Sequence, residues 1–580
     1  MLHGPAYSHN RAMMATTSAT IKQFSSLAVG ARVVVVSAWA LAIAVSCQEQ
    51  PVVPVELPDT FVVADAGNTA TGPEVAWSID ANAPIVAAIG LPPACTTTWN
   101  FALPKLPAPN GDIGIEPSGM MSVVGEEEKI FLYVILPGKS TLDTAAEGPL
   151  QVQIDGGAQV LAIHSAQKGI GSVVIRFVGE GQHTLIATFA DGRSGSAAIY
   201  AYKTALPVWH IEMADGVFEQ MLQQAYLKGF FPATLRVGTQ AYPTVQIRLH
   251  GGTSVDLPKR SFRLNFGGGS SLPDGRKRLI LRGEYIDKSM LRTALSYQAF
   301  RLATWLPTPN AEFVHVRVNK RFYGVMHLVD HIDGDYLKAR GRNATGTLYE
   351  GDPPHELSNP GANLTPVFPA TNYPKLYDKH QGPSSLADLI ALIEDVLLLP
   401  DIELVKVLDL HYKVRDWLEY AALMTVLQNH EHVRKNWYMY RDHAGKDGRF
   451  ETLVWDLDVT WGHLWSEKND VFDEAITTTA PADKGSKKVD SIFYNQLYRI
   501  LDQPAWRKVW QQRVLELANI LLSDSFLQPR LDYWRCLLAP DLLADQRKRA
   551  TNAEYLQRVD EIKAFAKGRR AFLVQQLGSP

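Results

Sequence analysis

The sequence predicts a multidomain protein in which an all-β, immunoglobulin-like sandwich precedes a larger α+β domain of two lobes. The chain has 580 residues, which is too long for a single core at roughly 100 to 200 residues per domain. Short alternating strand patterns fill residues 111–204, and glycine-rich turns separate them. Beyond residue 205, strand patterns come first and helical periodicities follow. That order is typical of an α+β enzyme with a β lobe and a helical lobe.

Residues 1–47 have the pattern of an export signal with a lipid-attachment site. Lys22 and Arg32 precede an uncharged apolar run, 33–45, which is too short for a mature membrane span but fits the core of a signal peptide. Small residues lead up to Cys47, as in the lipobox of bacterial lipoproteins. We therefore expect an exported, extracytoplasmic protein that a lipid on Cys47 anchors to a bacterial membrane. A cleaved signal with an incidental cysteine is the alternative.

The composition argues against nucleic acid as a partner. The net charge of −3 and the pI near 6.6 give no field that would attract nucleic acid. The sequence also contains no arginine-rich stripe or zinc-finger spacing, so we expect no nucleic-acid partner. Two of the three cysteines, Cys95 and Cys536, could pair in an oxidising compartment, but the sequence leaves this open.

The segment between the signal and the large domain divides into two parts. Residues 48–110 are rich in proline, alanine, threonine and valine, which is typical of a linker or stalk. Strand patterns in the second part include 129–135, 171–178 and 183–189. About seven such strands in this length predict the immunoglobulin-like sandwich of residues 111–204.

The large domain, residues 205–578, begins with strands and continues with helices. The expected strands are 234–237, 244–249, 261–266, 279–282, 313–318 and 323–329. The expected helices are 290–302, 385–399, 410–427 and most of 491–577. A stretch rich in proline, glycine and asparagine, 352–384, is expected to form a long functional loop near the junction of the lobes.

A glycine-rich turn with basic residues follows one of the expected strands. Arg248 precedes the segment His-Gly-Gly-Thr-Ser, which ends at Ser254, and a second basic segment contains Lys259 and Arg263. Backbone amides exposed by the two glycines could cradle phosphate oxygens, and the basic side chains could neutralise them. Such a turn is also common as a plain hairpin, so this segment alone leaves the phosphate site open.

Two further segments carry acidic and amide side chains at informative spacings. Glu431 stands five positions before Asn436, the spacing of the protein-kinase catalytic loop, in which the acid accepts the proton of the substrate hydroxyl and the amide holds a metal. About 20 residues later, an apolar strand ends in Asp456 and Asp458. Acids beside tryptophans are costly to bury unless a cation compensates them, which favours Mg²⁺. The plainer alternatives are a capped helix end and a capped turn.

These three segments, in this order, resemble the CotH family of spore-coat-type atypical protein kinases. The resemblance covers roughly residues 206–577, close to two thirds of the chain. The segments that carry it are FFPATLRV, RLHGGTSVDLPKRSFRLNF, YIDKSMLRTALSYQAFR, VRVNKRFYGVMHLVDHID, KNWYMYRD, WDLDVTWG and IKAFAKGRRAFLVQQL.

The resemblance implies an atypical protein-kinase-like fold for residues 205–578. It also implies that ATP and Mg²⁺, or Mn²⁺, bind between the lobes and that phosphate passes to Ser or Thr of a surface or coat protein. By position, Lys259 resembles the nucleotide-contacting lysine, with Arg248, Ser254 and Arg263 beside it.

The metal-binding and catalytic positions follow from the same resemblance. Asn436 resembles a metal ligand, and Asp456 resembles the metal-binding aspartate, with Asp458 next to it. Glu431 stands where the family usually has the catalytic aspartate, and the extra methylene moves the carboxylate by about an ångström. Asp330 likewise stands where members often have glutamate.

Two other functions remain open at this point. A catalytically weak, kinase-like surface protein for adhesion or assembly would accommodate both Glu431 and the added sandwich. A metal-dependent hydrolase would use His430, His432, Asp456 and His463. Asp287 and Arg292 are expected to form a structural ion pair, in which the aspartate also caps the start of a helix.

Overall fold

The computed structural model describes residues 110–578, with gaps at 112, 117–120, 138, 140, 147, 158–160, 165–169, 353–361, 383–384, 430–431, 433–434, 446 and 464–495. The described residues belong to one compact unit of the chain. The predictions for Cys47, for the signal and for the stalk lie outside them, as do Cys95, His430 and Glu431. Among the described residues the chain is multidomain and combines several β sheets with helices, which confirms the coarse fold prediction.

The first described region contains two antiparallel sheets that share one hydrophobic core. Their strands are β1 (Asn110–Gly111), β2 (Ile113–Glu116), β3 (Met121–Val123), β4 (Glu127–Val134), β5 (Pro149–Ile154), β6 (Leu161–His164), β7 (Ile170–Arg176), β8 (Gly181–Phe189) and β9 (Ser194–Tyr202). The larger sheet has the order β1-β9-β8-β5-β6, with β3 parallel to β9, and the smaller sheet has the order β2-β4-β7. Side chains of β4 alternate between buried and partly exposed positions, as expected for a strand with one face on a core. We call this region the two-sheet module.

A closed barrel follows the two-sheet module. Its strands are β10 (Val208–Glu212), β11 (Phe231–Val237), β12 (Gln240–His250), β13 (Ser261–Phe266), β14 (Arg278–Arg282), β15 (Ala311–Val318) and β16 (Arg321–Asp330). Six of these strands overlap the expected ones, whereas β10 was not predicted from the sequence. β10 closes the barrel because it pairs in parallel with β15 and antiparallel with β11.

Alternation along the barrel strands separates apolar from charged side chains. Leu249, Phe262 and Leu281 belong to the barrel's buried apolar core. Their neighbours Arg248, Arg263 and Arg282 therefore lie on the outer face of β12, β13 and β14, since successive side chains of a strand point to opposite sides. This outer face carries the basic side chains of the candidate site.

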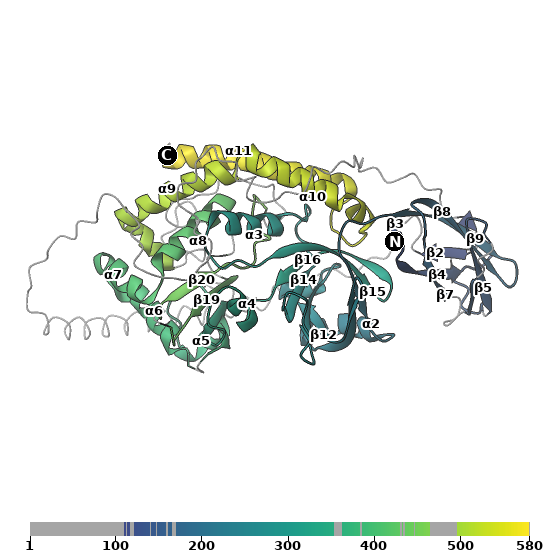
Figure 1. Cartoon of the computed structure of the whole chain (residues 1–580), viewed down its shortest axis with the longest axis horizontal. Helices are drawn as coiled ribbons and strands as arrows, with labels where there is room; N and C mark the ends of the chain where they lie inside the picture. The colour runs from purple at the N-terminus through teal and green to yellow at the C-terminus, as the bar shows by residue number, and fades with distance from the viewer. Residues whose placement is uncertain are drawn as a thin grey trace, which may run out of the picture. The chain divides into compact units, whose positions relative to one another are not determined.

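A further, four-stranded sheet and a set of helices share the largest hydrophobic core. The sheet has the order β18-β17-β19-β20, formed by β17 (Thr347–Gly351), β18 (Asp378–Gln381), β19 (Trp437–Arg441) and β20 (Phe450–Leu453). The helices of this core are α3 (Arg292–Ala303), α4 (Gly334–Ala339), α5 (Tyr373–Leu376), α6 (Ala387–Leu398), α7 (Asp401–His411), α8 (Val414–Leu427), α9 (Pro504–Leu521), α10 (Asp524–Ala544) and α11 (Asn552–Leu577), whereas α2 (Val217–Gln223) packs on the core of the barrel. In Figure 1, α9 lies beside α8, and α11 runs along the same side of the molecule.

Buried polar contacts connect the two-sheet module to the barrel and to α10. Arg317 of β15 forms an ion pair with Glu128 of β4, and both side chains are almost completely buried. The carboxylate of Asp541 accepts hydrogen bonds from Tyr202 (3.0 Å) and Thr204 (2.7 Å) and also contacts the His315 ring (2.6 Å). Breaking such a buried pair is expected to destabilise a fold by about 3 to 5 kcal/mol. The described two-sheet module is thus packed against its neighbours.

Two further observations concern export and disulfides. No helix among the described residues is both long enough and apolar enough to cross a bilayer. Cys536 of α10 takes part in a disulfide, and both other cysteines of the sequence lie outside the described residues. Pairing of Cys95 with Cys536 stays a prediction.

Candidate nucleotide and metal site

Two carboxylates lie directly after β20, at the end of a buried strand. Leu453, Val454 and Leu457 anchor this segment in the largest core, so the intervening Asp456 and the following Asp458 are held beside the barrel. The backbone of Asp456 has a left-handed φ of 51°, which is rare for a residue with a side chain. Its amide donates to the Tyr297 hydroxyl at 3.2 Å. Such a backbone conformation costs on the order of 1 to 3 kcal/mol and is found most often at functional sites.

Arg282, the last residue of β14, lies between these two carboxylates. One terminal nitrogen donates to Asp456 and the other donates to Asp458 at 3.1 Å. The Arg282 Nε contacts a third carboxylate, that of Glu284, at 2.9 Å. Burial by itself would raise the pKa of Asp456, but the adjacent Arg282 outweighs burial and lowers it. Both aspartates predicted from the sequence therefore converge on one cation.

Two arginines on the neighbouring strands have no carboxylate partner among the described residues. Arg248 of β12 and Arg263 of β13 are direct cross-strand neighbours. Among the described residues, the Arg248 Nε is buried without a hydrogen-bond partner, and the Arg263 side chain makes one long hydrogen bond of 3.4 Å to Asn265. Burial lowers the pKa of both guanidinium groups. Like charges directly opposite each other destabilise a sheet, so this pair is suited to an anion.

His250 links the arginine pair to the acidic pair. Burial, together with the charges of Arg282 and Arg248, lowers the pKa of its imidazole to about 3, although Asp456 opposes this shift. The ring is therefore neutral at pH 7. Because Arg248, Arg282 and Asp456 all act on one imidazole, the basic face of the barrel and the acidic segment after β20 lie within electrostatic reach of each other.

The glycine turn beside the arginines has a steric requirement. Gly251 has a φ of 110°, and a Cβ atom there would lie 2.0 Å from the Ser254 Oγ. A larger residue would therefore have to displace the Ser254 hydroxyl and would adopt a strained backbone conformation. The turn lies at the end of β12, next to Arg248, as the sequence predicted.

Asn436 lies at the start of β19 with the same unusual backbone as Asp456. Its φ is 61°, its side chain is buried, and its amide donates to the Gly351 carbonyl at 2.7 Å. β19 pairs with both β17 and β20, so Asn436 and the acidic segment belong to adjacent strands of one sheet. Glu431 lies outside the described residues, and its role stays a prediction.

The donor set around Asp456 is compatible with a hard divalent cation. Mg²⁺ in proteins is usually held by one or two carboxylates together with substrate phosphates and water, rather than by a complete protein cage. Asp456 and Asp458, with the amide of Asn436 on the next strand, offer such oxygen ligands. Among the described residues, no group of three or more His, Cys, Asp or Glu side chains is arranged to hold a metal ion.

Comparison with known proteins identifies the family of the chain. The family described as "CotH kinase protein" matches residues 247–573. The chain belongs to the CotH family. Among characterised proteins, the inner spore coat protein H of Bacillus subtilis (strain 168) is 25% identical over 349 residues, which covers 60% of this chain and 90% of that protein. The endo-beta-1,4-mannanase from Thermotoga petrophila matches 16% of this chain and 20% of its own, at 13% identity and a TM-score of 0.13, too low to bear on the fold.

Within this CotH domain, Lys259 has a partner that the sequence did not suggest. Its ammonium group forms an ion pair with Asp545 at 2.6 Å, and both side chains are fully buried. Asp545 also accepts hydrogen bonds from three backbone amides, those of Val325, Arg547 and Lys548. The nucleotide contact of Lys259 stays a prediction, but the described geometry gives this lysine a structural role between the barrel and the end of α10.

We expect Lys259→Met to destabilise the CotH domain by about 3 to 5 kcal/mol, because it leaves Asp545 buried without its counter-charge. Equilibrium denaturation of the variant measures this loss. The matched control is Lys277→Met, at an exposed lysine close to the same barrel strands. If Lys259 instead contacts nucleotide, the variant will keep parental stability and lose ATP affinity.

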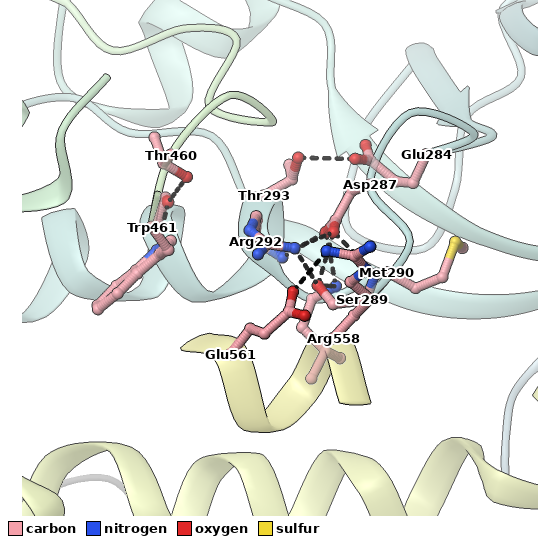
Figure 2. A network of polar contacts seen from close by, with 12 residues as sticks. Glu284, Asp287, Ser289, Met290, Arg292, Thr293, Thr460, Trp461, Arg558 and Glu561 are labelled. Carbon is pink, nitrogen blue, oxygen red and sulfur yellow. Dashed lines mark hydrogen bonds and ion pairs between the residues drawn. The ribbon is translucent and has the colours of Figure 1, made fainter. Parts of the chain in front are cut away.

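Asp287 and Arg292 form a structural cluster rather than part of the candidate site. Asp287 is buried, pairs with Arg292 at 2.7 Å, and accepts the amides of Leu291 and Arg292 at the start of α3. Figure 2 shows this cluster with Ser289 beside it. Although burial opposes it, Arg292 and His463 lower the pKa of Asp287 to about 2. The predicted capping ion pair is confirmed.

Two of the histidines considered for a hydrolase, His432 and His463, have described contacts with groups other than the Asp456 carboxylate. Burial lowers the pKa of His463 to about 4, and its next electrostatic neighbours are Arg292 and Asp287. The ring of His432 bonds instead to the Asn429 carbonyl at 2.9 Å. Asp330 is likewise engaged elsewhere, with Arg340 at 2.7 Å.

Three residues near the site were not predicted from the sequence. Arg282 is the last residue of an expected strand and Glu284 follows it; both belong to the ion-pair cluster with the two aspartates. Asp352 lies just beyond β17, and its pKa is raised to about 7 by desolvation and by the charges of Glu350 and Asp456. In the sequence, these residues could be recognised only as charged residues at or just after the ends of strands. Many strands on protein surfaces end in the same way, so this feature does not identify a site.

Proposed function

We propose that this CotH protein is a surface-anchored atypical protein kinase that transfers phosphate from ATP to Ser or Thr of a surface or coat protein. The family is described as a kinase, and its B. subtilis relative is named as a spore coat protein. The finer features of the proposal are an immunoglobulin-like fold for the two-sheet module and a kinase-like arrangement of the barrel and the helical part as two lobes.

The observation that carries the proposal is that a pair of arginines and a group of carboxylates lie close to each other. Arg248 and Arg263 offer two guanidinium groups without a carboxylate partner among the described residues. Asp456 and Asp458, with Glu284, place three carboxylates around Arg282, and the charge of Lys435 also acts on Asp456. A nucleotide phosphate complements the first set and a divalent cation complements the second, so a metal–nucleotide complex would satisfy both.

The roles of the residues follow from this arrangement. Arg248, Arg263 and the turn at Ser254 would hold phosphate oxygens, while Asp456, Asp458 and Asn436 would hold Mg²⁺ or Mn²⁺. When bound, the cation would neutralise charge on the phosphates. Glu431 would accept the proton of the acceptor hydroxyl. Catalysis of phosphoryl transfer rests mainly on such positioning and charge compensation.

Radiolabelled ATP tests the proposal. The full chain, purified with Mg²⁺ or Mn²⁺, is expected to label itself or proteins of a mixed surface extract, and hydrolysis of the labelled protein should release phosphoserine or phosphothreonine. Loss of labelling in Asp456→Asn would assign the signal to this site. Absence of labelling from the parent protein would favour the adhesion or assembly function, for which Glu431 in place of the usual aspartate is the supporting observation. Tightly held zinc in metal analysis would favour the hydrolase instead.

The surface anchor is a separate part of the proposal. If a lipid on Cys47 holds the protein on a membrane, Cys47→Ala should move most of the protein from the membrane to the soluble fraction, because a lipid chain supplies the apolar area for insertion. Fractionation followed by a salt wash measures this shift. A Cys47→Ala protein that stays on washed membranes would contradict lipid anchoring.

A further inference from the structure

Arg282 lies between Asp456 and Asp458 and contacts both carboxylates. Its two terminal nitrogens each reach a different aspartate, and its Nε reaches Glu284. Just 12% of the arginine side chain is exposed, so solvent does little to screen these contacts. One guanidinium is therefore shared by three carboxylates from two parts of the chain.

Glu284 holds this arginine from the barrel side. Its side chain is completely buried, and one of its oxygens accepts a hydrogen bond from Thr293 of α3 at 2.9 Å. Figure 2 shows the Thr293 hydroxyl turned toward Glu284. The backbone of Glu284 also has a positive φ, 47°, which fixes its position just after β14. Arg282 is thus tethered to the barrel whether or not the two aspartates remain bound to it.

The two aspartates, in contrast, could bind either Arg282 or a metal ion. Arg282 meets three carboxylates with a single positive charge, and the charge of Lys435 also acts on Asp456. A divalent cation near Asp456 and Asp458 would compete with the guanidinium for the same oxygens. A guanidinium released from carboxylates is also a strong ligand for phosphate oxygens.

We propose that Arg282 is a built-in counter-ion that makes the site selective for metal–nucleotide complexes over free metal. The inference rests on the proposed function only for the identity of the nucleotide. Without phosphate, Arg282 holds the aspartates and opposes binding of a lone cation. With phosphate present, Arg282 gains a new anionic partner as the aspartates move to the metal, so metal and nucleotide bind cooperatively.

Arg282→Gln tests this coupling, because it removes the charge and keeps a polar, although shorter, side chain. We expect Mn²⁺ alone to bind the variant about tenfold more tightly than the parent, since a competing positive charge is gone. We expect affinity for Mn²⁺ together with a non-hydrolysable ATP analogue to fall by about tenfold, since a phosphate ligand is lost. Paramagnetic resonance of free Mn²⁺ and calorimetry measure the two affinities in the full chain.

Two further variants separate charge from folding. Arg278→Gln changes an arginine of the same strand that pairs with Asp333 instead, and it should leave both affinities unchanged. Arg282→Lys retains the charge and should keep Mn²⁺ binding close to the parental value. If Arg282→Gln unfolds the protein, the lysine variant still tests the idea, because a compact ammonium cannot bridge both aspartates and should weaken the metal–nucleotide coupling.

The outcomes distinguish this inference from the proposed function. Tighter Mn²⁺ binding by Arg282→Gln, together with nucleotide binding but no phosphate transfer by the parent, would support the counter-ion and overturn the kinase. Nucleotide binding by the parent with unchanged or weaker Mn²⁺ binding by Arg282→Gln would support the kinase and overturn the counter-ion. The metal-only measurement requires no enzymatic activity.

Discussion

Asp456→Asn is expected to lower the affinity for an Mn²⁺–ATP complex by about a hundredfold or more, because it removes a charged oxygen ligand from a hard-cation site. The effect should be large because Asp456 has a constrained backbone, with a φ of 51°, and cannot easily be replaced by another residue of the same segment. Calorimetric titration of the folded variant with Mn²⁺ and a non-hydrolysable analogue measures the loss.

The control for this substitution follows from the structure. Asp287→Asn is unsuitable, because Asp287 is buried and paired with Arg292, and its loss would damage the fold. Asp274→Asn is better matched, since Asp274 is an exposed aspartate on the hairpin between β13 and β14. Equal affinities of Asp456→Asn and Asp274→Asn would remove Asp456 from the metal site.

The barrel shows which strands can be predicted from the sequence pattern and which cannot. Six of its strands are predictable because apolar residues such as Leu249 and Leu281 recur at every second position and fill the interior. β10 (Val208–Glu212) has the same alternation but is short and isolated in sequence. It becomes a barrel strand only through its parallel pairing with β15, about 100 residues later, and local pattern contains no information on such a partner.

The site shows the same limit for charged residues. The acidic pair was predictable because two aspartates after a buried strand require compensation. The compensating residue was not, since Arg282 and Asp456 are 174 positions apart in sequence. Lys259 and Asp545 are 286 positions apart, and the sequence alone cannot tell a paired lysine from one that awaits phosphate. Only the three-dimensional contacts distinguish Lys259, which has a carboxylate partner, from Arg248 and Arg263, which have none among the described residues.

Glu431→Gln is expected to lower phosphate transfer by about 10² to 10⁴-fold while leaving ATP affinity nearly unchanged, because a general base acts on the acceptor hydroxyl rather than on the nucleotide. Single-turnover labelling at saturating ATP and metal measures the rate, and calorimetry measures the affinity. Lower ATP affinity with an unchanged rate would instead place Glu431 among the nucleotide ligands.

Glu431→Asp provides the matched control, because it keeps the charge and shortens the side chain to the length usual in the family. A misplacement of about 1 Å can cost on the order of a hundredfold in rate, so this variant should transfer phosphate at least as fast as the parent. If the parent is inactive, Glu431→Asp should restore measurable labelling, since Arg248, Arg263 and Asp456 would already position the nucleotide. Equal rates for the parent and Glu431→Gln would show that position 431 takes no part in the chemistry.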